Sequence, residues 1–161
     1  MPLIIPARAE YYRECWIWKG EIVTEKIEWE GKTLALIVRQ SYEPEGANFI
    51  TSEDSPLQLG VLKHRPDHTI KPHIHKNPPR TINETQEVLY IAYGKVEADF
   101  YASAGKKVAS TVLDAGDTIL LVSGGHGFNI LEDSKIIEVK QGPYHGVEED
   151  KERIQAGGVE R

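Results

Sequence analysis

The sequence predicts an all-β protein, built as a sandwich or barrel of short strands. The 161-residue chain contains 14 Gly and 9 Pro, which supply turns, and 40% hydrophobic residues, which supply a core. Short β-prone runs alternate with these turn residues, as is typical of small sandwiches and barrels. The length fits one domain that can bury a sizeable core. We therefore expect a single β domain.

The first half of the chain contains three predicted β elements. Residues 21–38 form two β-prone runs around Gly31, which predicts a hairpin. Residues 58–64 predict the next strand. A turn at residues 65–68 then leads to a predicted strand that holds residues 71–75.

The second half is predicted to continue the same pattern. Residues 87–101 are two β-prone runs interrupted by Gly94, which predicts a second hairpin. Further strands are expected within residues 116–122 and 135–141. The first arm of the 87–101 hairpin is apolar on both faces apart from Glu87, so both faces should be covered. One face would line the core, and the other favours contact with a second layer or with a second subunit in a homodimer.

Four side chains in this β framework are suited to one divalent transition metal. His73 and His75 occupy positions i and i+2 of a predicted strand, so both imidazoles can point to the same side. Glu87 begins the second hairpin, and His126 follows the turn after residues 116–122, in what would be a separate hairpin. Imidazole and carboxylate donors suit Fe, Mn, Ni, Co or Zn.

At these residues the chain resembles the cupin superfamily. The first cupin motif matches His73, His75, Glu87 and Gly94, with six residues between Glu87 and Gly94, and the second matches Gly116, Gly124, His126 and Asn129. The resemblance implies a double-stranded β-helix, or jelly-roll, barrel with one metal bound by His73, His75, Glu87 and His126. It divides the chain into an N-terminal arm (1–20), a barrel (21–146) and a charged tail (147–161), which we interpret as a solvated helix or frayed end without a catalytic role.

The chain departs from the cupin pattern at three places. The segment between His75 and Glu87 is longer than in the family and contains Glu84, a competing carboxylate. Val122 replaces the usual proline, and His126 follows Gly124 one residue earlier than expected. The assignment of Glu87 therefore rests on its place at the start of the hairpin.

The resemblance implies a metal-binding protein and favours a metal-dependent enzyme acting on a small oxygenated metabolite, such as a sugar derivative. Isomerisation, decarboxylation and dioxygenation all suit a metal with open positions. One alternative is a noncatalytic cupin that binds a metal or a sugar. Another is a metal-free sugar-nucleotide isomerase or epimerase that uses His73 or His75 as a base, because the fold alone does not fix the chemistry.

Three residues are candidates for binding the small-molecule ligand. Arg80, in the proline-containing loop, could hold an anion as part of a partial lid, although an exposed loop arginine explains it equally well. Tyr93 and Phe128 could form a wall of the pocket, while aromatic residues at such spacings more often belong to the core.

Composition limits the expected partners and compartment. The formal net charge of −6 argues against nucleic acid as a ligand, because phosphate backbones require a positive surface. No apolar run approaches the length of a membrane span. Cys15 is the only cysteine and no signal peptide is indicated, which favours the reducing cytoplasm. The aromatic-rich N-terminal arm could complete the core or exchange with a second subunit.

Overall fold

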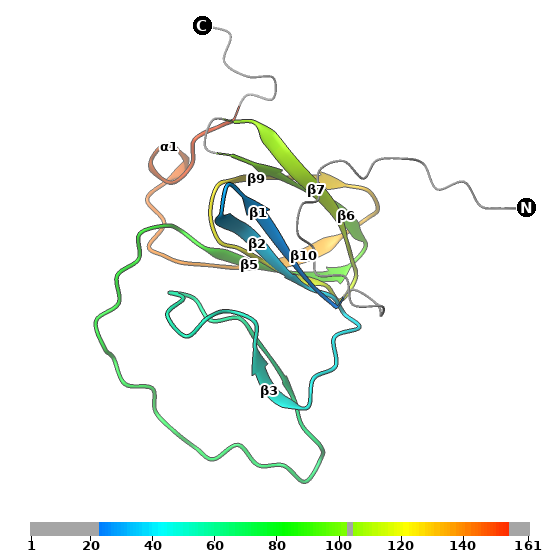
Figure 1. Ribbon diagram of the computed structural model, residues 1–161, viewed down its shortest axis with the longest axis vertical. Coiled ribbons are helices and arrows are strands. Elements are labelled where there is room, and N and C mark those ends of the chain that lie inside the picture. Colours follow the sequence, from blue (N-terminus) through cyan, green and yellow to red (C-terminus); the bar gives the residue numbers. More distant parts are fainter. Residues whose placement is uncertain (1–22, 103–104, 155–161) are drawn as a thin grey trace, which may run out of the picture.

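A computed structural model describes residues 23–102 and 105–154 and confirms the all-β prediction (Figure 1). The predicted N-terminal arm, Cys15 and the last residues of the tail lie outside these ranges. The strands are β1 (Thr24–Trp29), β2 (Lys32–Val38), β3 (Gly46–Phe49), β4 (Gly60–Lys63), β5 (Glu87–Tyr93), β6 (Lys95–Tyr101), β7 (Lys107–Asp114), β8 (Thr118–Leu121), β9 (Gly125–Ile130) and β10 (Lys135–Lys140), followed by the short helix α1 (Val147–Asp150).

The strands form antiparallel sheets in two layers, with a separate hairpin. One sheet has the order β1-β2-β8-β5-β10, and the second has the order β7-β6-β9. Among the described residues, β3 and β4 pair only with each other. The predicted hairpin β1–β2 is present and turns at Gly31, whereas β5 and β6 follow one another at Gly94 but belong to different sheets and do not pair. Within the described ranges, no helix has the length and apolar composition that a membrane span requires.

The core lies between the two sheets. Leu89 and Ile91 of β5 face Val96, Ala98 and Phe100 of β6 in one buried cluster. Alternation along each strand directs these side chains to the same interior, because successive residues of a strand point to opposite faces. Together these residues position one end of the sandwich, where β5 begins and β6 ends.

In the part of the chain that the structure describes, the opposite face of β5 is covered only in part, which leaves room for the second layer or second subunit that the sequence predicts there. The turn between β3 and β4 packs on the outer face of the five-stranded sheet, where Thr51 and Leu120 are buried. Nearer the edge of that sheet, Tyr90 is 42% exposed, and its neighbours Ile137 and Val139 on β10 are 48% and 60% exposed. An apolar surface therefore remains open along β5 and β10.

A partly buried group of ion pairs joins the chain at one corner of the sandwich. The Arg39 guanidinium donates to Asp117 Oδ2 at 2.6 Å and to Glu25 Oε1 at 2.7 Å through Nε. Asp117 also accepts the backbone amides of Gln40 and Asp114. These bonds tie β1, the end of β2 and the β7–β8 turn together.

Two predictions of local structure are wrong. Residues 71–75 form no strand; they lie in a segment without regular structure between β4 and β5. Pro72 has no amide hydrogen for a ladder, and no described strand runs beside the segment. The second error concerns the hairpins expected over residues 87–101 and around His126, because β5 and β6, like β8 and β9, belong to different sheets.

Gly94 provides a test of the turn that joins the two sheets. Its φ is +88°, and an added Cβ would overlap Ser134 and the Asp133 carbonyl, whereas Gly31 has a φ of +77° and open space around it. We expect G94A to lower the free energy of unfolding by about 2–4 kcal/mol, from backbone strain and overpacking. The control G31A introduces backbone strain without overlap, so it should lower the free energy of unfolding by about 1 kcal/mol. Urea unfolding measures both, and equal losses would contradict the packing argument.

Candidate functional site

Glu87 and His126 face each other at one end of the sandwich. Glu87 is paired with Leu121 and His126 with Phe100, and residues paired across antiparallel strands share a face. Because Leu121 and Phe100 are buried core residues, both functional side chains point inward from opposite sheets. His126 Nε2 lies 3.4 Å from Glu87 Oε2. The structure thus brings together two of the four predicted metal ligands.

Local contacts fix both residues. Before β5, the Gln86 amide donates to Gln141 Oε1 at 3.0 Å, which ties the start of β5 to the chain after β10. Before β9, the Val122 amide donates to the Leu34 carbonyl at 2.8 Å as the chain crosses between sheets. Gly124 completes this crossing with a φ of +72°, and a Cβ there would lie 2.8 Å from the Tyr101 carbonyl oxygen. The site is therefore built on strands and tight connections.

The Glu87 carboxylate has a lowered pKa. The hydrogen bond with the His126 side chain is the main cause, and it outweighs burial, which favours the neutral acid. Positive charge on His126, Lys151 and Lys140 adds to the effect. Only 8% of Glu87 is exposed, so at neutral pH the site contains a buried carboxylate anion that favours a cation.

The pair opens into a cleft of about 530 Å³. The charged tail reaches this cleft, because Ile154 lies against the backbone at Gly125. The sequence predicts a solvated helix or frayed end without a catalytic role, and the structure places residues 150–154 of this tail in the lining of the cleft. Besides Glu87 and His126, the lining residues are Thr85, Tyr101, Gly124, Gly125, Gly127, Lys140, Asp150, Lys151, Glu152, Arg153 and Ile154.

His73 and His75 lie in the exposed segment that leads from β4 to β5. Their ring centroids are 4.9 Å apart, and His73 Nδ1 is 3.0 Å from the Lys71 carbonyl oxygen. Within residues 23–102 and 105–154, no three His, Cys, Asp or Glu side chains form a group that could hold a metal ion. The structure therefore contains two pairs of the predicted ligands, Glu87 with His126 and His73 with His75, rather than one assembled site.

The residues considered for ligand binding are divided between different places. Phe128 lies close to the pair, with its ring centroid 5.6 Å from that of His126. Tyr93 is at the far end of β5, about 20 Å along the strand from Glu87, so it cannot line the same cleft. Arg80 is exposed in the 64–86 segment and is not among the residues that line the cleft. The competing carboxylate Glu84 bonds Lys32 Nζ at 3.0 Å on the surface.

The cations of the cleft were not identified from the sequence. Lys140, Lys151 and Arg153 all line it. Lys140 ends a strand whose register is set by pairing with Glu87, so the strand prediction contained a usable signal for that residue. Lys151 and Arg153 follow α1, and their position depends on how the tail packs, for which the sequence offers no pattern.

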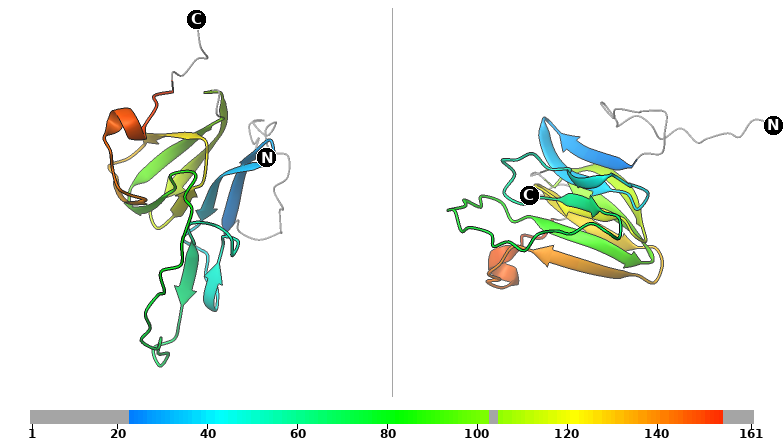
Figure 2. Two further views of the ribbon diagram at one scale, coloured as in Figure 1. Left: turned by 90° about the vertical axis from the view of Figure 1, so that its left-hand side faces the viewer. Right: turned by 90° about the horizontal axis from the view of Figure 1, so that it is seen from below.

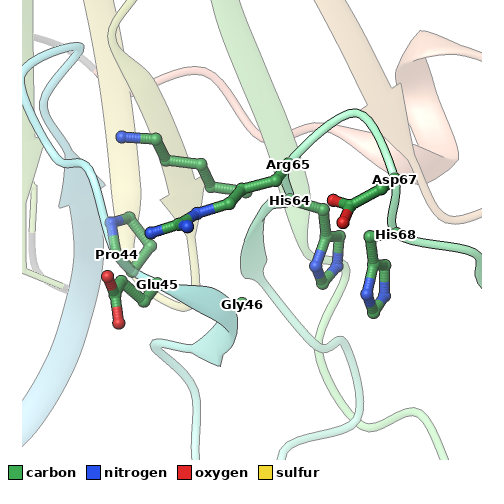
Figure 3. Close-up of a pocket in the computed structure, with 8 residues that line it drawn as sticks. Pro44, Glu45, Gly46, His64, Arg65, Asp67 and His68 are labelled. Carbon is green, nitrogen blue, oxygen red and sulfur yellow. The ribbon is translucent and has the colours of Figure 1, made fainter.

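A second cleft, of about 560 Å³, lies beyond the open end of the β3–β4 hairpin (Figure 3). In it the rings of His64 and His68 stack at 3.9 Å with an interplanar angle of 8°. Stacked rings direct their nitrogen lone pairs outward in parallel, so the two histidines do not converge on one ion. Arg65 extends toward Pro44 and Glu45 in the same cleft (Figure 3).

Comparison of the chain with protein-family models, curated proteins and solved structures found no match.

The lowered pKa of Glu87 can be tested by removing its partner. In H126L the hydrogen bond is lost while burial remains, so we expect the pKa of Glu87 to rise above its wild-type value. Carbon-13 NMR titration of the Glu87 carboxyl, with a chelator present, measures the change. H68L, which removes an exposed histidine of the other cleft, is the control and should leave the titration unchanged. If Glu87 has the same pKa in H126L and in wild type, the hydrogen bond between Glu87 and His126 is contradicted.

Proposed function

We propose that the chain is a metal-binding protein of cupin type, in which His73, His75, Glu87 and His126 hold one divalent transition metal. The observation that carries this proposal is the buried Glu87 carboxylate directed at the His126 imidazole from the opposite sheet. Carboxylate and imidazole are both ligands of Fe, Mn, Ni, Co and Zn. Two ligands leave such an ion with open positions, and His73 and His75 are a further pair of adjacent imidazoles on the exposed segment between β4 and β5.

The strand arrangement supports the finer assignment to a jelly-roll barrel. In the described chain β9 and β10 are edge strands, and they follow one another in the sequence. They therefore border one side of the sandwich, which is open between them. A jelly roll has two four-stranded sheets, so one strand added beside β9 would bring the three-stranded sheet to four. The segment that carries His73 and His75 would supply the strand beside β9, next to His126.

The cleft suits a small, strongly oxygenated ligand. Lys140, Lys151 and Arg153 line it together with the carboxylates of Glu87, Asp150 and Glu152. A bound metal would supply Lewis acidity for isomerisation, decarboxylation or dioxygenation. The cations would orient the ligand and offset its charge. A noncatalytic metal- or sugar-binding role uses the same cleft without turnover.

A metal-free enzyme is the second candidate, and the 3.4 Å contact between His126 and Glu87 favours it. A carboxylate beside an imidazole can orient the ring for proton transfer. In this version His126 would act as the base, and the alternative with His73 or His75 as base loses support because both are exposed outside the cleft.

Metal content tests the proposal directly. We expect wild type to bind about one equivalent of a divalent metal per chain after reconstitution with Mn, Fe, Co, Ni or Zn, measured by elemental analysis. H75A should lose most of it, because one imidazole donor is missing, while its circular dichroism stays β-rich. H68A is the matched control, an exposed histidine of the same segment, and should keep its metal. Wild type without metal, or H75A with a full equivalent, would refute the assignment.

The two candidate carboxylates can be separated by substitution. E87Q should weaken metal affinity roughly 10- to 100-fold, because amide oxygen is a poorer ligand than carboxylate. E84Q should leave affinity unchanged, because Glu84 is engaged with Lys32 on the surface. Competition with a metal-sensitive chelator measures both affinities. An equal or larger loss in E84Q would move the ligand assignment to Glu84.

A further inference from the structure

The segment that carries His73 and His75 extends away from the sandwich. We call β3, β4 and residues 64–85 the extension. In Figures 1 and 2 it projects from one end of the molecule, and every residue from 62 to 85 is exposed. Ile74 is 94% exposed, and Leu62, Ile70 and Ile82 are each more than half exposed. A long exposed loop with apolar side chains is uncommon in a compact domain unless it binds something.

The extension contacts its own sandwich through the turn between β3 and β4 and, near its end, through the ion pair between Glu84 and Lys32. The residues between β3 and β4 pack on the outer face of the five-stranded sheet beside Leu36 and Leu120, and Thr51 is 9% exposed there. These contacts fix the closed end of the hairpin at β2 and β8. Its open end, at Gly46 and Lys63, points away from the sandwich (Figure 2). The anchored turn therefore directs the extension outward, where it can reach another molecule.

The side of the sandwich at β9 and β10 has the surface that such an extension needs. Both strands are edges in the described sheets, and edge strands present unpaired amides and carbonyls that another strand can pair with. Apolar side chains are exposed along them: Ile130 is 58% exposed and Val139 is 60% exposed. A strand added beside β9 would lie next to His126, since directly opposed residues in adjacent strands are about 5 Å apart.

Charge complementarity favours this surface as the partner of the extension. Residues 62–85 contain five lysines and arginines against two acidic residues, although the whole chain has a net charge of −6. Residues 131–154, which include β10 and α1, contain seven acidic residues against four basic ones. The extension and the stretch that contains β10 and α1 therefore have opposite net charges within one sequence, although Lys140, Lys151 and Arg153 of that stretch line the cleft at His126. This is the pattern expected of two identical copies that exchange an element.

We propose that the metal site is shared between two copies of the chain. The extension of one copy lies along β9 of the other, so that His73 and His75 of the first join Glu87 and His126 of the second. The inference rests on the proposed metal site and adds that its ligands come from two chains. Twofold symmetry gives each dimer two such sites.

Mixing variants distinguishes a shared site from a site within one chain. H75A and H126A should each lose most of their metal alone. When equal amounts are unfolded, mixed and refolded, each heterodimer with a shared site keeps one intact ligand set, so metal returns to about one quarter of the wild-type content. The control mixture of E87Q and H126A impairs the same half of the site in both chains. This mixture should hold less metal than the first mixture, and no more than the average of E87Q and H126A measured separately.

A second mixture measures a loss of metal, whereas the first measures a return of metal. A double variant with both H75A and H126A is mixed in equal amounts with wild type. Every heterodimer then lacks both shared sites. Metal then falls to about one quarter of the wild-type content, whereas sites within one chain would leave about half. Light scattering should show a dimer for wild type and for each refolded mixture.

The outcomes separate the two proposals. Suppose that wild type binds metal but the first mixture regains none, or that the second mixture keeps half of the wild-type metal. Either result would overturn the shared site and leave the metal site within one chain. A monomeric wild type that binds metal would likewise overturn the shared site alone. Wild type without metal would refute the proposed function and the shared site together.

Discussion

The turn at Gly94 is the constraint on which the two-layer structure depends. It joins β5, which lies between β8 and β10, to β6, which lies between β7 and β9, so one turn connects the two sheets. Glu87 lies seven residues before Gly94, and Phe100, which pairs with His126, lies six residues after it. The strands β5 and β6 are equal in length. For this reason the carboxylate and the imidazole meet at the end of the sandwich remote from the turn.

Many of the strands could be predicted because the turns between them contain their own signals. The β1–β2 and β5–β6 connections each turn at a glycine with positive φ, and the alternating apolar residues of these strands match their buried faces. Sequence patterns could not show that β5 and β6, or β8 and β9, separate into different sheets, because strand pairing is decided by long-range packing. The strand expected at residues 71–75 relied on the spacing of two histidines, while its proline and the absence of a described neighbouring strand opposed it.

The candidate site was predictable to a similar degree. The prediction that Glu87 and His126 belong together agrees with the 3.4 Å contact between their side chains. It came from the spacing of the residues that resemble the two cupin motifs. The joining of His73 and His75 to that pair stays a prediction. The cations Lys151 and Arg153 were missed because the tail reaches the cleft through the packing of Ile154 against Gly125. Such a contact between distant segments leaves no local pattern in the sequence.

A shared site would make assembly and metal binding one equilibrium. Ligands divided between two chains bind the ion well only in the dimer, so the metal would stabilise the dimer by mass action, and the dimer would raise the apparent metal affinity. The exposed isoleucines of the extension and the open apolar side chains of β9 and β10 would be buried in the same step, adding about 25 cal/mol for each Å² of apolar surface removed from water. The basic charge of the extension would then serve chiefly to speed and orient the encounter of the two chains, since interfacial charge affects association rate and register more than affinity.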